Sequence, residues 1–168
     1  MTIPTTPPAG IFTDVPGGLR LHHYEAGEGR PVVFIHGSGP GASGFSNFKH
    51  NVPAFAAAGY RAIVVDLPGY GQSSKPADVA YTLDFFVSAL HAQLTALGLG
   101  PAVLLGNSPG VPIALKYAHD HPAADDGLIS MAPAGHEVRD PSSPVGSISR
   151  TGTLFPQPTL DHDTLSTR

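Results

Sequence analysis

The chain has 168 residues, of which 41% are hydrophobic and 13% are charged, a composition typical of one globular domain with its own core. Its net charge of −4, with 9 lysines and arginines, provides no basic surface, and we therefore expect no nucleic-acid partner. Cysteine is absent, which excludes disulfides, thiolate metal sites and a cysteine nucleophile. The N-terminus lacks the pattern of a signal peptide and no apolar run is long enough to span a membrane, so we expect a cytoplasmic protein without a membrane partner.

Strands alternate with helices along the chain, after a proline-rich lead-in over residues 1–17 that is expected to be irregular. The predicted strands are residues 19–24, 31–36, 61–66, 102–105 and 127–132, and the predicted helices are residues 45–58 with a kink or break at Pro53, 83–97, and about 113–118. The first strand alternates, whereas the other four are continuous apolar runs, typical of strands buried on both faces. Thr82 can cap the start of the long helix and Gly98 can close its end.

This alternation predicts an α/β fold with a mostly parallel sheet flanked by helices. Such sheets place their functional sites at the carboxyl ends of strands. Three features lie at predicted carboxyl ends, namely the glycine-rich loop His36–Gly39, Asp66 and Ser108.

The sequence GNSPG, residues 106–110, comes directly after a buried strand and opens a helix, which is the context of a nucleophile elbow. The residue after the serine in such an elbow normally offers its backbone N–H to the developing oxyanion, and Pro109 has no N–H. Proline nevertheless suits the start of a helix, as does Pro112 in the first turn, because the first N–H groups have no helical partner.

Three stretches carry a family resemblance: FIHGSGPGASGFSNF (34–48), VVDLPGYGQS (64–73) and LLGNS (104–108). Together they resemble the N-terminal part of an α/β-hydrolase, over roughly residues 19–136. HGSGPGA with the downstream SNF is similar to the meta-cleavage product hydrolases. The resemblance implies a serine-dependent hydrolase that cleaves a carbon–carbon bond in a ring-cleavage product of aromatic degradation, of the 2-hydroxy-6-oxo-dienoate type.

The resemblance also implies a role for each matching position. Ser108 would be the nucleophile, and the backbone N–H of Ser38 would be one oxyanion donor. The positions implied for substrate binding are Gly37, Gly39, Asn47, Asn107 and Pro109, with the two asparagines near the dienol and carboxylate end of the substrate. The substrate is a small molecule, and no cofactor or metal is implied.

The chain departs from the family on the C-terminal side of the nucleophile. Only residues 109–168 remain there for a lid and for later strands bearing the acid and the histidine. We therefore expect an α/β-hydrolase fold that lacks its C-terminal strands and most of its lid. The expected organisation is a lead-in over 1–17, the N-terminal part of the core over 18–136, and the start of a lid or an irregular tail over 137–168.

Local substitutes for the missing base are His136 and His162, the latter within Asp161–Asp163, but 9 histidines in the chain make chance proximity the stronger interpretation. His36 is expected to be structural and Asp66 to form a turn. The neighbours His22 and His23 lie on a strand whose side chains alternate, so we expect no shared metal site there.

The sequence leaves three alternatives to an active carbon–carbon hydrolase open. An esterase or lactonase would share the same fold and motifs. A catalytically silent module that binds a ligand or partner is favoured by Pro109 and the missing base. Two chains that complement each other in a homo-oligomer are the last alternative, since a sheet ending at its fourth buried strand would leave an open apolar edge.

Overall fold

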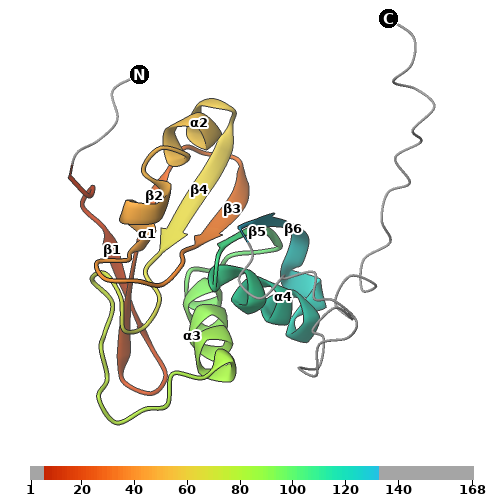
Figure 1. Cartoon of the computed structure of the whole chain (residues 1–168). Helices are drawn as coiled ribbons and strands as arrows, with labels where there is room; N and C mark the ends of the chain where they lie inside the picture. The colour runs from red at the N-terminus through yellow and green to blue at the C-terminus, as the bar shows by residue number, and fades with distance from the viewer. Residues whose placement is uncertain (1–5, 133–168) are drawn as a thin grey trace, which may run out of the picture. The chain divides into compact units, whose positions relative to one another are not determined.

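The structure is a computed structural model and describes residues 6–132 (Figure 1). The elements in chain order are β1 (Ile11–Val15), β2 (Leu19–Ala26), β3 (Arg30–Ile35), α1 (Gly44–Phe48), α2 (Val52–Ala57), β4 (Tyr60–Val65), α3 (Leu83–Ala96), β5 (Ala102–Asn107), α4 (Gly110–Asp120), the 3-10 helix η1 (Pro122–Ala124) and β6 (Asp125–Met131). The expectation for residues 137–168 lies outside the described residues.

The strands form one sheet in the order β1-β2-β4-β3-β5-β6. β3 is parallel to β4 and β5, and β5 is parallel to β6, whereas β2 is antiparallel to β1 and β4. The predicted α/β fold with a mostly parallel sheet is therefore confirmed. Ile35, at the end of β3, lies opposite Val65 of β4 and Gly106 of β5, so the loops after these three strands leave the same edge of the sheet.

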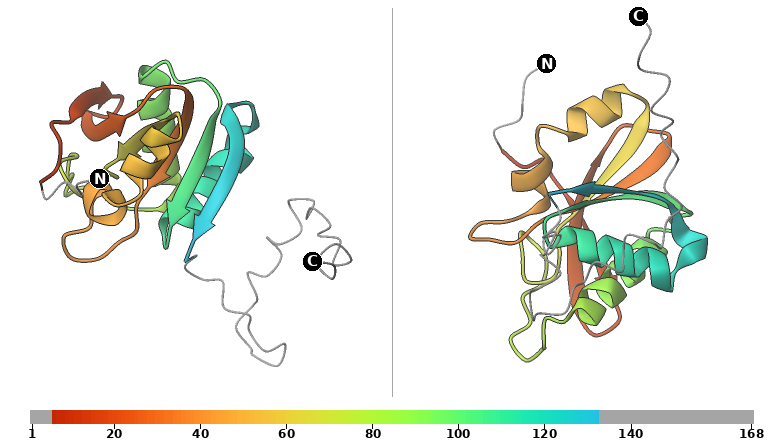
Figure 2. Two further views of the ribbon diagram at one scale, coloured as in Figure 1. Left: turned by 90° about the horizontal axis from the view of Figure 1, so that it is seen from above. Right: turned by 45° about the vertical axis from the view of Figure 1, so that its right-hand side comes forward.

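Helices cover both faces of the sheet, with α1 and α2 on one face and α3 and α4 on the other (Figure 2). Because side chains alternate along a strand, Val33 and Ile35 pack among the residues of α3 and α4. Val32 and Phe34 pack on the opposite face with residues of α1 and α2. This double coverage explains why β3, β4 and β5 are continuous apolar runs.

The predicted helix over residues 45–58 is instead two short helices. α1 ends at Phe48 and α2 begins at Val52, so the break precedes Pro53. Pro53 occupies the first turn of α2, where its missing N–H costs no helical hydrogen bond. Ser43 starts α1 with a reciprocal capping box, in which its hydroxyl accepts from the Ser46 N–H and the Ser46 hydroxyl accepts from the Ser43 N–H.

One expectation about the N-terminal part is wrong and one is confirmed. The segment 1–17 is not irregular throughout, because Ile11–Val15 form β1 and pair with β2. The strand predicted over 19–24 is confirmed as β2, although its burial does not alternate: His22, His23 and Tyr24 are all buried. The reason is tertiary, since β2 is an interior strand with α3 packed on one face and Phe45 of α1 near Tyr24 on the other.

The strand predicted over 127–132 exists as β6 but is not buried on both faces. Within the described part of the chain it is the last strand of the sheet, paired on one side with β5. Ile129 is 39% exposed and Met131 is 36% exposed as a result. Apolar character therefore predicted the strand correctly but overstated its burial.

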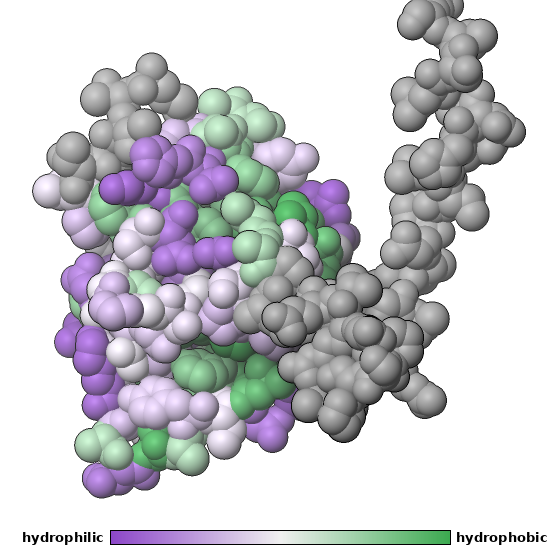
Figure 3. Space-filling model, in the orientation of Figure 1, coloured by the Kyte–Doolittle hydropathy of each residue, from purple (hydrophilic) through white to green (hydrophobic). Residues whose placement is uncertain are grey.

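None of the helices among the described residues combines the length and the apolar character needed to cross a membrane. On the face shown in Figure 3, hydrophilic and hydrophobic residues are interspersed.

Candidate active site

Ser108 lies in the sharp turn between β5 and α4, and its backbone is in the left-handed region with φ of 52°. A residue with a Cβ atom rarely adopts this conformation, which costs of order 1–3 kcal/mol and persists only where its surroundings enforce it. Here the Ser108 N–H donates to the carbonyl of Met131 on β6 (3.0 Å), and the Ser108 carbonyl accepts from the Val111 N–H (3.0 Å). The backbone at Ser108 thus has the strained strand-to-helix geometry of an elbow.

The two glycines that flank the elbow allow the turn to be this tight. A methyl group added at Gly106 would lie 2.6 Å from the carbonyl oxygen of Gly110. One added at Gly110 would lie 2.2 Å from the carbonyl oxygen of Ile35, so α4 begins directly against β3. The spacing of the glycines in GNSPG therefore has a steric cause that is visible in the packing.

Pro109 has φ of −63° and ψ of −12° and sits immediately before Gly110, the first residue of α4. These angles suit a proline ring, so the residue fits the helix start without distortion. It offers no N–H toward the side chain of Ser108. The elbow therefore forms with proline in place, but without the donor that this position usually provides.

The glycine-rich loop after β3 lies against the elbow. A methyl group added at Gly37 would be 3.3 Å from the Cβ atom of Ser108, so the two turns lie close together. Gly37 is buried, whereas Ser38 and Gly39 are exposed. The peptide that carries the Ser38 N–H therefore begins at a residue that lies beside the candidate nucleophile.

Asn47 and Asn107, predicted near the substrate, are brought together beside these turns. The Oδ1 atom of Asn47 accepts from the Asn107 Nδ2 (2.7 Å) and from the backbone N–H of Gly37 (3.0 Å). Both side chains are half-buried. The α1 helix, the glycine-rich loop and the elbow are therefore joined at one carbonyl oxygen.

His36 is buried and its two ring nitrogens bond to backbone groups. Nε2 accepts from the Leu67 N–H (3.0 Å), and Nδ1 lies 2.6 Å from the Gly37 carbonyl oxygen. Burial lowers the pKa of His36, and the bond to Gly37 and the nearby Asp66 carboxylate oppose this effect. These contacts support the expectation that His36 is structural.

Asp66, at the end of β4, organises the turns around it. Its Oδ1 accepts from the Gly44 N–H (2.7 Å), and its Oδ2 accepts from the Gln72 N–H (2.9 Å) and lies 2.8 Å from His22 Nδ1. With both oxygens bonded in this way, Asp66 has the turn-forming role expected from the sequence.

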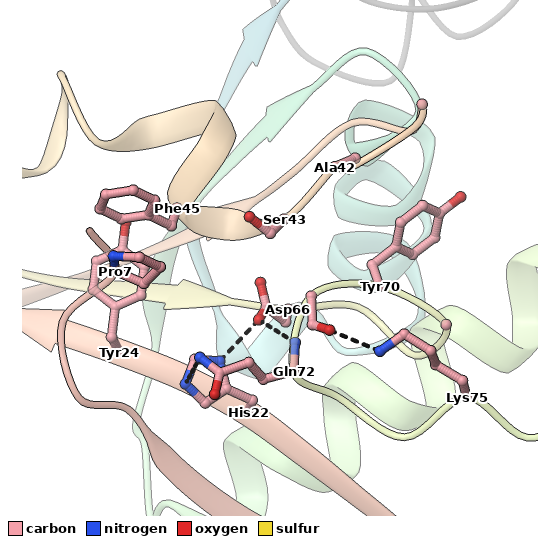
Figure 4. Close-up of a pocket in the computed structure, with 14 residues that line it drawn as sticks. Pro7, His22, Tyr24, Ala42, Ser43, Phe45, Asp66, Tyr70, Gln72 and Lys75 are labelled. Atoms are coloured by element: carbon pink, nitrogen blue, oxygen red, sulfur yellow. Dashed lines mark hydrogen bonds and ion pairs between the residues drawn. The ribbon is translucent and has the colours of Figure 1, made fainter. Parts of the chain in front are cut away.

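A cavity of about 450 Å³ adjoins these groups, between β2, the loop after β3 and the loop after β4. Figure 4 shows Asp66, His22 and Gln72 together on its floor, with Ser43 above them and Lys75 to one side. Tyr24 also lines the cavity, and its buried hydroxyl has no hydrogen-bond partner among the described residues. Ser108 is not one of the lining residues.

The side chains of His22 and His23 have different surroundings. His22 faces Asp66, whereas the ring of His23, the next residue along the strand, is fully buried with neither nitrogen hydrogen-bonded to a described residue. Within residues 6–132 no group of three or more histidine, aspartate or glutamate side chains is arranged to hold a metal.

No histidine or carboxylate of residues 6–132 forms a hydrogen bond with the Ser108 hydroxyl, so the described residues provide no base in contact with it. His136, His162 and the acids Asp161 and Asp163 lie outside the described residues.

Sequence reasoning missed two features of the site. These are the Asn47 side-chain oxygen that accepts two hydrogen bonds, and the hydrogen bonds made by both ring nitrogens of His36. Their partners are separated in the chain by up to 60 residues, and no local pattern signals such a contact.

A family model described as alpha/beta hydrolase fold matches residues 30–154. A 2-hydroxy-6-oxononadienedioate/2-hydroxy-6-oxononatrienedioate hydrolase of Burkholderia vietnamiensis is 39% identical over 149 residues, covering 86% of this chain and 51% of that protein. A meta-cleavage product hydrolase from Pseudomonas fluorescens has a TM-score of 0.71 at 32% identity, over 75% of this chain and 46% of that one. An esterase from Exiguobacterium antarcticum has a TM-score of 0.65 at 31% identity, over 74% and 46%.

The chain spans about half the length of the curated relatives it matches. The family model nevertheless covers most of the chain, and its match includes the glycine-rich loop, the turn at Asp66 and the elbow at Ser108. This chain belongs to the α/β-hydrolase fold family.

Proposed function

We propose that this protein is a serine-dependent hydrolase that cleaves a carbon–carbon bond in a small ring-cleavage product, a 2-hydroxy-6-oxo-dienoate. The observation that carries the proposal is the strained backbone of Ser108, held at φ of 52° beside the glycine-rich loop. Strain of this kind at a polar residue is typical of a functional position. The substrate class is taken from the relatives, which match this chain over about half of their own length.

In this reaction the Ser108 hydroxyl attacks the 6-oxo carbonyl carbon and its proton passes to a base. The carbonyl oxygen becomes an oxyanion, which the Ser38 N–H would stabilise. Collapse of the adduct breaks the carbon–carbon bond, and the departing dienol carbon takes up a proton. Water then releases the acyl group from Ser108 as a carboxylic acid.

The base that this scheme requires would come from outside residues 6–132. His162 and His136 are the candidates that the sequence offers within this chain. Pro109 leaves the oxyanion with one donor fewer than a usual elbow, and the loss of one such donor typically lowers the rate about 10²–10³-fold. We therefore propose slow turnover rather than efficient catalysis.

Esterase or lactonase activity is the second candidate, because an esterase is among the solved structures with this fold. The two activities differ in substrate while sharing the nucleophile and the oxyanion. Two assays separate them. One follows the loss of the dienoate absorbance of 2-hydroxy-6-oxononadienedioate, and the other follows the release of nitrophenol from a p-nitrophenyl ester. Turnover of the ester alone would favour the second candidate.

Intact-mass spectrometry after treatment with a fluorophosphonate probe tests whether Ser108 is activated. We expect one adduct, which Ser108→Ala abolishes and Ser88→Ala retains. Ser88 is a matched control because it is an exposed serine of α3, on a different element from the elbow. A folded protein that forms no adduct would contradict the proposal and favour a silent module that binds a ligand or partner.

A further inference from the structure

The two peptide groups that flank Gly37 are each held by a side chain. The N–H of Gly37 belongs to the first peptide and donates to Asn47 Oδ1 (3.0 Å). The carbonyl of Gly37 belongs to the second peptide and lies 2.6 Å from His36 Nδ1. The second peptide is also the one that carries the Ser38 N–H, so its orientation decides where that N–H points.

The direction of each of these bonds is set by a fixed backbone donor. The Gly37 N–H can only donate, so the Asn47 atom that faces it is the amide oxygen. The Leu67 N–H can only donate, so His36 Nε2 is the acceptor and the ring proton is on Nδ1. The imidazole therefore donates to the Gly37 carbonyl.

A trans peptide places its N–H antiparallel to its C=O. Because His36 binds the carbonyl of Gly37 on the buried side, the Ser38 N–H is directed away from His36. Gly37 lies beside Ser108, since a methyl group added at Gly37 would be 3.3 Å from the Ser108 Cβ atom. The oriented peptide is therefore close to the candidate nucleophile.

Asn47 also ties this loop to the elbow. The oxygen that accepts from the Gly37 N–H accepts from the side chain of Asn107, the residue immediately before Ser108 (2.7 Å). The Nδ2 of Asn47 is in turn held by the Ser43 carbonyl (3.2 Å) at the start of α1. The amide oxygen of Asn47 is therefore occupied by two protein donors before any ligand arrives.

We propose that Asn47 is a positioning residue, which with His36 aligns the Ser38 N–H for the oxyanion at Ser108. This rests on the proposed function in so far as the Ser38 N–H is an oxyanion donor. It changes the assignment of Asn47 from a substrate contact to a support of the donor. Alignment matters more in this chain than in one with a complete elbow, because Pro109 provides no second donor.

Amide hydrogen exchange, resolved by NMR on the 168-residue chain, tests the alignment without requiring activity. In Asn47→Ala we expect the Gly37 amide to exchange at least about tenfold faster, because its hydrogen bond is lost, while amides of β3 and β4 are unchanged. Asn47→Asp keeps the acceptor oxygen that faces the Gly37 N–H and replaces only the amide nitrogen that faces Ser43, so we expect slow exchange at Gly37 to be restored. Asn51→Ala is the matched control: Asn51 precedes α2 and makes no side-chain cap hydrogen bond.

Unchanged exchange at Gly37 in Asn47→Ala would overturn the proposal. If Asn47→Ala does not fold, the wild-type chain still decides through the trans-hydrogen-bond coupling between the Gly37 amide nitrogen and the Asn47 side-chain carbonyl carbon, whose absence would also overturn it.

The rate of fluorophosphonate labelling at Ser108 separates this proposal from the proposed function. We expect Asn47→Ala to label about tenfold or more slowly, since a misplaced donor stabilises the oxyanion poorly. Unchanged labelling despite fast exchange would overturn the positioning role. A wild-type chain that does not label would contradict the proposed function, while the exchange result would still show whether Asn47 holds the loop.

Discussion

The Asp66 carboxylate joins three segments of the chain through hydrogen bonds to Gly44, Gln72 and His22. Replacing Asp66 by Asn turns one acceptor oxygen into a donor. Whichever way the amide is placed, it faces a backbone N–H, either that of Gly44 or that of Gln72. We expect Asp66→Asn to lower the free energy of unfolding by about 1–3 kcal/mol, the usual effect of leaving a buried donor unpaired.

Urea denaturation monitored by circular dichroism measures this change. Asp78→Asn is the control, because Asp78 is exposed in the loop before α3 and its substitution should change the free energy of unfolding by less than about 0.5 kcal/mol. Equal stability of Asp66→Asn and the wild type would show that the carboxylate does not hold these turns together.

At the level of residues, the sequence predicts what depends on neighbours in the chain. The turn at Ser108 is permitted by Gly106 and Gly110, whose spacing is local and whose missing side chains allow close packing. The bond between Asn47 and Asn107 joins residues 60 positions apart, and it depends on how β3 and β5 are paired. No pattern within either segment indicates which atom of Asn47 faces the loop.

The α4 helix can place its first residue against β3 only because that residue is glycine. In Gly110→Ala the new methyl group would meet the Ile35 carbonyl, at 2.2 Å, so the helix start or the strand must move. We expect a loss of about 1–3 kcal/mol or more in the free energy of unfolding. We also expect fluorophosphonate labelling to become slower, because the same shift moves Ser108.

Gly100→Ala is the matched control for this helix. Nothing lies within 4 Å of a methyl group at Gly100, which is in the turn before β5. The two variants change the same atom count and are compared by urea denaturation and labelling. Similar stability in both would mean that the contact between α4 and β3 is not as tight as the geometry indicates.

At the level of elements, continuous apolar runs predict β3, β4 and β5 because helices cover both faces of these strands. The same reasoning fails for β6, since a single strand does not reveal whether a neighbour lies beyond it. β1 was missed because the proline-rich start of the chain hides a short strand whose partner, β2, is needed to stabilise it. Pairing and position in a sheet are tertiary properties, which local composition does not encode.

The stability of the whole molecule is expected to fall in mild acid, because two fully buried histidines favour their neutral forms. Burial lowers the pKa of His23, an effect that Glu25 opposes while His22 and Arg61 reinforce it. Burial likewise lowers the pKa of His36. In the unfolded chain both residues titrate near the usual value of about 6.5, so the unfolded state binds protons first as the pH falls.

This difference in pKa sets the sign of the pH dependence. Above about pH 6.5 the two histidines are neutral in both states and stability is flat with respect to them. Below it the free energy of unfolding decreases, by up to about 1.4 kcal/mol per pH unit for each histidine, until the pH reaches the lowered pKa of the folded state. Urea denaturation at steps between pH 8 and pH 5 measures this slope.

His23→Leu isolates the share of His23, which has no hydrogen-bond partner among the described residues that the substitution would remove. Leucine fills a similar space without a titrating group. Below pH 6.5 we therefore expect the free energy of unfolding to depend less steeply on pH, by an amount that corresponds to at most one bound proton. At neutral pH we expect a stability equal to or above that of the wild type. His50→Leu is the control for replacing an exposed histidine by leucine, since His50 is exposed in the turn between α1 and α2. If His23→Leu retained the full pH dependence, or lost stability at pH 8, His23 would not be the neutral, unpartnered group that its burial on β2 indicates. A hydrogen bond to the ring would then have to explain its place in the core.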